Sequence, residues 1–179
     1  GALLAHHEKG IVVPLSIPKA HVHMDEPQLK VSIKRSKKLL QQALQISQEF
    51  QAKAKPVIRI DDDVAGGISR AAREQNANLI VMGWSPTSSL QARLFGNIID
   101  NVFWAAHCPI AVMRLLDEPI NIHSVLVPVG NITPEILRAI EFAQFFADTN
   151  QASVTLLHVR PRKTTDKEIA LFESELSEY

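Results

Sequence analysis

The sequence predicts an α/β fold in which a parallel sheet carries helices on both faces. Short β-branched segments alternate with amphipathic ones in the order strand, helix, strand, helix, strand, loop, helix, strand. One of these strands, Leu79–Met82, is apolar at every position, which is typical of buried parallel strands. Because consecutive parallel strands need a crossover between them, the alternation predicts right-handed strand–helix–strand units.

Turn residues bound the first predicted elements. Ala2–Ala5 is predicted to be the last turn of a helix, which Lys9 and Gly10 close as a C-cap. Ile11–Ile17 is short, β-branched and followed by a proline, so it predicts a strand or a strand edge. Residues 21–27 are polar and turn-like.

A long amphipathic helix is predicted over Gln28–Gln51, because its apolar side chains fall mostly on one stripe and its lysines on another. Pro56–Ile60 predicts the next strand. The aspartates Asp61–Asp63 then supply an N-cap and first-turn negative charge for a helix through Glu74.

A loop and a further helix follow the apolar strand Leu79–Met82. Residues 84–95 are rich in Ser, Thr and Pro, which predicts a loop. Gly96 and Asn97 open a helix that carries apolar side chains through Ala106, and Pro109–Met113 predicts another strand.

The same pattern then restarts. Val125–Val129 predicts a strand, and Thr133 caps a helix that begins with proline and runs to about Thr149. Residues 154–159 predict a second strand, and 166–179 a helix. We therefore expect one unit over residues 1–116, a linker over 117–123 and the first half of a second unit over 124–179, which together form a weak internal repeat.

The composition is that of an ordinary globular protein. The chain has 179 residues, 46% hydrophobic and 21% charged, and 19 basic side chains balance 19 acidic ones. These values exclude a disordered, collagenous or disulfide-rich protein, and zero net charge argues against a nucleic-acid binder. One cysteine, no signal peptide and no run of 18 apolar residues lead us to expect a cytoplasmic domain.

A glycine-containing turn follows the apolar strand. Val81, Met82 and Gly83 are separated from Gly96 by a stretch that ends in the nine residues Thr87–Phe95, and Cys108-Pro109 precedes the last strand. In this respect residues 56–114 resemble the universal stress protein family, whose signature is Gly-x-x-Gly, nine residues, then Gly-Ser or Gly-Thr. The stretch 125–159 is similar in texture to the opening of a second copy. The resemblance implies a Rossmann-like or flavodoxin-like fold, present as an incomplete tandem.

The resemblance also implies a nucleotide site. Glycines let backbone N–H groups approach phosphate oxygens, and a helix N-terminus favours an anion. The sequence assigns no cofactor outright, and an adenine nucleotide, ATP or AMP, is the candidate ligand. The positions that contact it in ATP-binding members correspond here to Met82, Gly83, Gly96, Asn97 and Ile98.

Three departures from the family pattern weaken this hypothesis. Pro86 replaces the second glycine and removes an N–H donor, while Asn97 replaces Ser or Thr but can still cap a helix. The acidic residue that nucleotide-binding members carry after their first strand is also missing, and Gly130 stands at that place in the second unit. The alternative is a loop that serves packing and turn geometry.

The turn Gly83-Trp84 resembles that of stress-protein domains appended to the cytosolic side of membrane transporters, such as cation/proton antiporters and amino-acid permeases. The chain begins at Gly1, and its final helical segment stops without a cap, so we expect a piece of a longer protein. The expected function is a cytosolic regulatory or sensing module that acts by ligand binding and association. The alternatives are a stand-alone ATP- or AMP-binding stress-response protein and a scaffold that only dimerises.

The resemblance implies that the first strand of such a unit lies in the middle of the sheet, and the first unit here lacks that strand. Unpaired backbone groups in a buried gap are costly. We therefore expect Val125–Val129, or its copy in another chain, to fill or neighbour the gap, or dimerisation to cover the open edge. A homodimer is the expected assembly.

Other chemistry-bearing residues have simpler interpretations. A metal site at His21, His23, Asp25 and Glu26 competes with a solvated loop, and magnesium at Asp61–Asp63 competes with helix capping. Cys108 is expected to be a buried structural thiol, because adjacent residues in a strand point to opposite faces. No Ser-His-Asp order, paired carboxylates or Gly-Lys-Ser motif is evident, so we expect no enzyme.

A basic helical face is the last feature of the sequence. Five cationic side chains gather on the predicted long helix, and they face solvent, an acidic partner or the anionic inner leaflet of a membrane. They are Lys30, Lys34, Arg35, Lys37 and Lys38.

Overall fold

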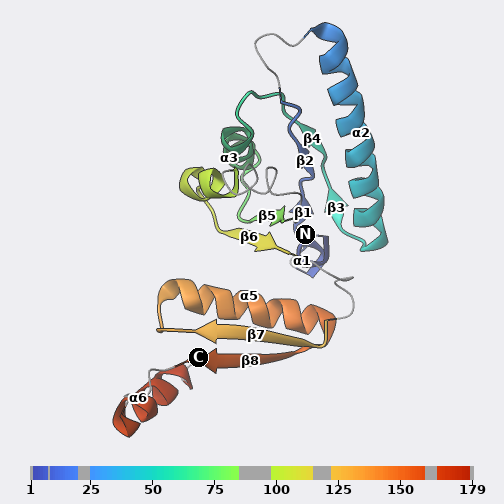
Figure 1. Ribbon diagram of the computed structural model, residues 1–179. Coiled ribbons are helices and arrows are strands. Elements are labelled where there is room, and N and C mark those ends of the chain that lie inside the picture. The colour runs from blue at the N-terminus through green and yellow to red at the C-terminus, as the bar shows by residue number, and fades with distance from the viewer. Residues whose placement is uncertain are drawn as a thin grey trace. The chain divides into compact units, whose positions relative to one another are not determined.

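The computed structural model describes residues 2–7, 9–19, 25–84, 98–114, 122–159 and 165–177 (Figure 1). The chain divides into two compact units, unit 1 (Gly1–Leu116) and unit 2 (Asp117–Tyr179). All strand pairs in the described ranges are parallel and alternate with helices. The predicted parallel α/β class is therefore confirmed. Of the expected linker 117–123, only the last two residues lie within the described ranges.

Unit 1 opens with the short helix α1 (Ala2–His7) and a strand that is interrupted at Pro14. The two parts of this strand are β1 (Ile11–Val12) and β2 (Leu15–Ser16), which pair with β3 (Lys53–Ala54) and β4 (Val57–Ile58) respectively. Pro14 has no N–H to donate to the ladder, although its carbonyl oxygen accepts from Val57 N–H at 2.9 Å. The strand expected at 56–60 begins earlier, at Lys53.

The long helix α2 (Glu26–Glu49) lies along these strands (Figure 1). Asp25 caps it by accepting the Gln28 N–H at 3.0 Å, and Pro27 occupies the first turn, where no N–H is needed. Its buried positions include Ser36, whose hydroxyl accepts from the Ser16 hydroxyl at 2.9 Å. A long-range hydrogen bond thus accompanies the apolar contacts between the helix and β2.

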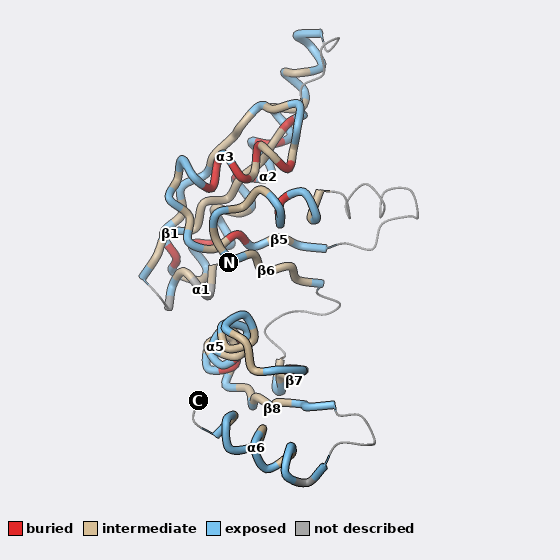
Figure 2. Tube along the Cα trace, turned by 90° about the vertical axis from the view of Figure 1, so that its left-hand side faces the viewer, coloured by how far each residue is buried: buried red, intermediate tan, exposed pale blue. Residues whose placement is uncertain are grey.

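The rest of unit 1 contains the helix α3 (Val64–Glu74), the strands β5 (Ile80–Gly83) and β6 (Ile110–Met113) and a helical segment at 98–105. The described core of this region gathers on α3, β5 and the helical segment (Figure 2). Its buried members are Ala65, Ala72, Ile80 and Val102. Val81 is 38% exposed, so the expectation that Leu79–Met82 is buried on both faces is wrong for this residue, because successive strand side chains alternate and the described core covers one face.

Unit 2 is built from β7 (Ser124–Val129), α5 (Pro134–Asn150), β8 (Ser153–His158) and α6 (Asp166–Leu176). The two strands pair in parallel from Ser124 against Ser153 to Val129 against His158. Val127, Val129 and Ala143 form the buried core, with Phe172 of α6 packed against it. The predicted strand, helix, strand and helix of this unit are all present.

Four helices end in the same backbone turn. The residue that follows the last turn is left-handed, with φ between 49° and 54°. The next residue donates its N–H to the carbonyl oxygen five positions back along the chain, at 2.8 or 2.9 Å. None of the four left-handed residues is glycine: they are Lys9, Gln51, Asn76 and Gln151. The predicted C-cap at Lys9 and Gly10 is confirmed, and the left-handed residue in it is the lysine.

The three strand pairs of unit 1 each keep an unpaired backbone edge within the described residues. Ile80 and Trp84 donate their N–H groups to β6, at Pro109 and Met113, so the alternate residues of β5 direct their backbone groups to the other side. On β1 and β2 the carbonyls of Val12, Pro14, Ser16 and Pro18 accept from the neighbouring strand. The residues between them, Val13, Leu15 and Ile17, face the open side. Pro14 and Pro18 therefore both lie on the paired side, and each of the three residues on the open edge keeps a backbone N–H donor.

The left-handed turn predicts opposite effects for two Gln→Gly substitutions, one inside α2 and one just after its end. Gln51→Gly should leave unchanged or raise the free energy of unfolding, by up to about 1 kcal/mol, because glycine removes the cost of a side chain in the left-handed region. Gln45→Gly, at an exposed position inside the helix, should lower it by about 1 kcal/mol. Urea unfolding followed by tryptophan fluorescence measures both, since Trp84 and Trp104 lie in unit 1. Equal destabilisation by the two variants would contradict the assigned turn.

Candidate functional site

The carboxyl ends of β5 and β6 lie side by side and form the candidate site. Gly83 pairs with Met113 at the end of the ladder, and Trp84 N–H donates to the Met113 carbonyl at 2.8 Å. Parallel α/β sheets bind their ligands beyond the carboxyl ends of the strands. The predicted residues Met82 and Gly83 therefore occupy a position where a ligand of this fold class binds.

Met82 and Ile98 contact the same core cluster, which is built around Ile80 and Val102. The structure thus brings two of the five predicted site residues to one core cluster, from segments that residues 85–97 separate in the sequence. Their side chains are engaged in packing, so their backbone groups are what they can offer to a ligand. Gly96 and Asn97, together with Pro86, lie outside the described residues.

Gly83 is exposed, and neither its backbone nor its described neighbours require glycine. Its φ is not positive, and a Cβ placed on it would meet no atom within 4 Å. The position leaves open space at the end of β5, where a side chain would otherwise project. Gly130, at the end of β7, has the same two properties.

Cys108 lies just before β6 and is half-buried against the core cluster of unit 1. Burial raises the pKa of its thiol, which disfavours the reactive thiolate. The carbonyl of the adjacent Pro109 accepts from Ile80 N–H at 3.0 Å, so the Cys-Pro pair sets the start of the β5–β6 ladder. These contacts support the interpretation of Cys108 as a structural thiol.

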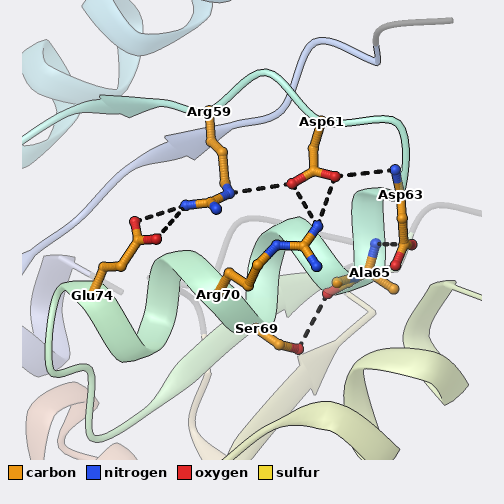
Figure 3. A network of polar contacts seen from close by, with 8 residues as sticks. Arg59, Asp61, Asp63, Ala65, Ser69, Arg70 and Glu74 are labelled. Carbon is orange, nitrogen blue, oxygen red and sulfur yellow. Dashed lines mark hydrogen bonds and ion pairs between the residues drawn. The ribbon is translucent and has the colours of Figure 1, made fainter. Parts of the chain in front are cut away.

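A polar network connects the end of β4 to α3 (Figure 3). Asp61 accepts from Arg70 Nη2 at 2.6 and 2.7 Å and from Arg59 Nε at 3.2 Å, while Arg59 Nη1 donates to both oxygens of Glu74 at 2.7 Å. The Arg70 guanidinium, then the Asp63 N–H and Arg59, hold the pKa of the Asp61 carboxyl well below its usual range despite its desolvation. Hydrogen bonds from Arg59 to Glu74 and Asp61 raise the pKa of the Arg59 guanidinium.

The aspartates Asp61–Asp63 are engaged in structural contacts. Asp63 accepts from Ala65 and Gly66 N–H at 3.1 and 3.0 Å and so caps α3, as predicted. Two arginines occupy the Asp61 carboxylate, which leaves it a poor magnesium ligand. The geometry therefore favours capping over the magnesium alternative.

The second metal hypothesis is only partly within the described residues. His21 and His23 lie outside them, whereas Asp25 caps α2 and Glu26 forms an ion pair with Lys30 at 2.7 Å. Among the described residues, no group of three or more His, Cys, Asp and Glu side chains could hold a metal ion.

An open hollow of about 280 Å³ lies where α1 and α2 end, and it contains none of the predicted site residues. It is lined by Ala5, His6, Lys9, Gly10, Gln51, Ala52 and Lys53. Both helices present their C-terminal carbonyls near it, and this end of a helix dipole disfavours an anion such as a nucleotide phosphate.

Sequence patterns alone did not single out Arg59 and Arg70, the cationic members of the Asp61 network. Arg70 and Glu74 are spaced i, i+4 on α3, which is a recognisable helical pair. Their actual partners, Asp61 and Arg59, come from the strand before the helix, and only the folded chain brings them within reach. The signal that could have indicated this network is an arginine, Arg70, on a helix that the aspartates Asp61–Asp63 precede.

Comparison with known proteins places this geometry in a family. The family model described as the Universal stress protein family matches residues 1–114, which is more than half of the chain. The chain belongs to the universal stress protein family.

One relative of this universal stress protein chain is a transporter. The chain is 51% identical over its whole length to part of the Na(+)/H(+) antiporter NhaS5 of Synechocystis sp., of which it spans 26%. Among the described helices of our chain, none is both long and apolar enough to cross a membrane.

Two solved structures share the fold. A universal stress protein from Archaeoglobus fulgidus is similar with a TM-score of 0.72 and 18% identity, covering 99% of this chain and 66% of that one. A putative universal stress protein from Pseudomonas aeruginosa has a TM-score of 0.62 at 14% identity, covering 99% of this chain and 70% of that one. Similarity at these identities establishes the α/β fold.

The low pKa of Asp61 predicts a pH-dependent contribution to stability. A carboxyl whose pKa is lowered by folding stabilises the native state above its unfolded pKa of about 3.9, and this stabilisation is lost as the pH falls toward the native pKa. Asp61→Asn should therefore lower the urea midpoint at pH 7, and the difference from wild type should shrink progressively below about pH 4.

Asp62→Asn is the matched control, because Asp62 is exposed and has no described partner. Its midpoint should follow wild type at every pH. A deficit of Asp61→Asn that stays constant from pH 7 to pH 3 would show that the carboxylate charge is not what stabilises this region.

Proposed function

We propose that this chain is the cytosolic regulatory module of a membrane cation/proton antiporter. The observation that carries the proposal is the 51% identity over the full chain to part of the antiporter NhaS5. Its family membership and α/β fold support a separately folded module beside the transport machinery. The two compact units are consistent with a tandem of related domains.

The module is proposed to act by binding and association. The candidate site at the ends of β5 and β6 offers backbone groups, open space at Gly83 and apolar side chains. The described thiol, Cys108, has a raised pKa, and the carboxylates Asp61 and Asp63 are engaged in ion pairs and a helix cap. These features suit ligand recognition better than bond-breaking chemistry.

The proposed ligand is an adenine nucleotide, ATP or AMP, bound at the carboxyl end of β5. Helix 98–105 follows the motif, so an N-terminal helix dipole is available to phosphate oxygens. The residues assigned to this role are Met82, Gly83, Gly96, Asn97 and Ile98. The proline at position 86 and the missing acidic residue at Gly130 favour weak binding.

Association is proposed to involve a second copy of the chain. The open edges at Val81 and Gly83 of β5 and at Val13, Leu15 and Ile17 each present N–H and C=O groups without a partner strand in the described residues. A strand donated by Val125–Val129 of another chain, or another dimer contact, would satisfy them. The mass of the chain in solution decides between this homodimer and a monomer.

The regulatory role predicts a separation between transport and its control. In the full-length antiporter that carries this chain, removal of residues 1–179 should preserve sodium-dependent proton movement in everted vesicles. The dependence of transport on pH and on added nucleotide should change. Transport that is identical in every respect without the segment would contradict a regulatory role, and complete loss with normal membrane insertion would indicate a part of the transport path.

The nucleotide hypothesis predicts different effects for two equivalent glycine substitutions. Gly83→Ala should reduce ATP and AMP affinity at least tenfold in calorimetry, because a Cβ there enters the space assigned to the ligand. Gly130→Ala, at a glycine with the same open surroundings in unit 2, should retain the wild-type affinity for nucleotide and the wild-type heat-capacity change of binding.

Two results separate the alternatives. No heat and no thermal shift at millimolar nucleotide would remove the nucleotide ligand and leave the scaffold alternative. Equal affinity in wild type and Gly83→Ala would place the nucleotide elsewhere.

A further inference from the structure

Helix α2 presents three distinct faces. Its buried face, which includes Ser36, Leu40 and Ser47, lies against the strands of unit 1 (Figure 1). With about 100° between successive residues, the remaining side chains divide into a basic stripe and a second, apolar stripe beside it. The second stripe is not explained by the packing of unit 1, because its members are exposed.

The basic stripe is unusually uniform in sign. Between Pro27 and Gln48 the helix carries five cationic residues and no acidic one. All five are exposed: Lys30, Lys34, Arg35, Lys37 and Lys38. Lys30 forms an i, i+4 ion pair with Glu26 at 2.7 Å, whereas the other four have no ion pair within the described part of the chain. The positive charge of this face is therefore largely uncompensated by the protein.

The apolar stripe consists of Val31, Leu39 and Ile46, which are 69%, 52% and 51% exposed. Their spacing of eight and fifteen residues places them within about 80° of one another, and Arg35 lies among them. Large apolar side chains beside lysines on an exposed helix are characteristic of helices that lie at the surface of an anionic bilayer. The apolar groups enter the boundary of the acyl chains while the ammonium groups meet the phosphates.

We propose that the outer face of α2 binds an anionic lipid surface. The partner follows from the combination of charge and exposed apolar side chains, and from the relative that is itself a membrane antiporter. The inference rests on the proposed function in one respect: a module attached to a transporter works close to a bilayer. It adds a surface and a lipid class that the nucleotide site does not involve.

The acidic helix α6 of a second copy is the competing partner, and it fits less well. Its Glu168 is engaged in a capping box with Thr165. Among the α6 residues whose side chains the structure describes, only Glu173 and Glu175 then remain as acidic partners for five cations. Such a contact would also leave the apolar stripe without a stated partner. An anionic bilayer surface, by contrast, offers enough phosphate groups to meet every cation along the helix.

Co-sedimentation of the purified chain with vesicles tests the proposal. The chain should bind vesicles of equimolar phosphatidylglycerol and phosphatidylcholine, and binding to pure phosphatidylcholine should be at least tenfold weaker. The triple variant Lys34→Gln, Lys37→Gln, Lys38→Gln should lower partitioning about a hundredfold, since each lysine near an anionic surface contributes about fivefold. The matched control Lys53→Gln, Arg73→Gln, Lys167→Gln makes the same charge change at exposed positions elsewhere and should retain most of the binding.

A second variant isolates the apolar contribution. Val31→Gln with Ile46→Gln leaves every charge in place and should reduce binding at high salt, where screening has removed the electrostatic part. Circular dichroism of each variant confirms that the helix is intact, because Gln is a good helix former.

Several outcomes would overturn the proposal. The first is equal binding to both vesicle types, and the second is equal binding by the two triple variants. The third is that the chain sediments as an oligomer, that only the α2 triple variant dissociates it, and that neither the oligomer nor the dissociated chain binds vesicles. Vesicle binding is measured without transport or nucleotide. If the chain binds lipid but its removal leaves transport unchanged, the regulatory role is refuted and the lipid-binding surface is not.

Discussion

Backbone hydrogen bonding constrains this molecule more than any side-chain contact does. A buried N–H or C=O group needs a partner, and in a parallel ladder alternate residues satisfy these groups on opposite sides. In unit 1 the ladder between β5 and β6 aligns the carboxyl ends at Gly83 and Met113, which creates the candidate site. The same ladders leave Val81 and Leu15 without a neighbouring strand in the described residues, so the site and the proposed association surface have one origin.

Local sequence patterns were sufficient to predict most elements of the fold. Asp63 and Thr133 are short polar residues before helical stretches, and both accept the expected backbone N–H groups. The patterns were insufficient where the outcome depends on another segment. No local pattern indicates that Gln51 adopts a left-handed conformation, which depends on the strand that follows. The missing N–H of Pro14 is a local signal, but whether it interrupts a strand depends on the side of the ladder on which the proline falls.

The candidate site shows the same division between local and distant information. The motif located Met82 and Ile98, and both side chains pack against the core cluster that contains Val102. The resemblance gave the reason for expecting a ligand there, whereas the aspartate run by itself suggested either a cap or a metal. The choice required Arg70, whose guanidinium reaches Asp61 across the end of β4. Charge partners of this kind become visible only when strand and helix are placed together.

The distribution of prolines on the first strand has a consequence for the isolated chain. Pro14 and Pro18 both lie on the side that faces β4, so the opposite edge has neither a proline nor a charged side chain among Val13, Leu15 and Ile17 to discourage strand addition. Natural sheets protect exposed edges with such residues, and residues 13–17 carry none on this open side. Any extended apolar segment can therefore add to it, and the resistance of the chain to aggregation depends on how completely a specific strand occupies that edge.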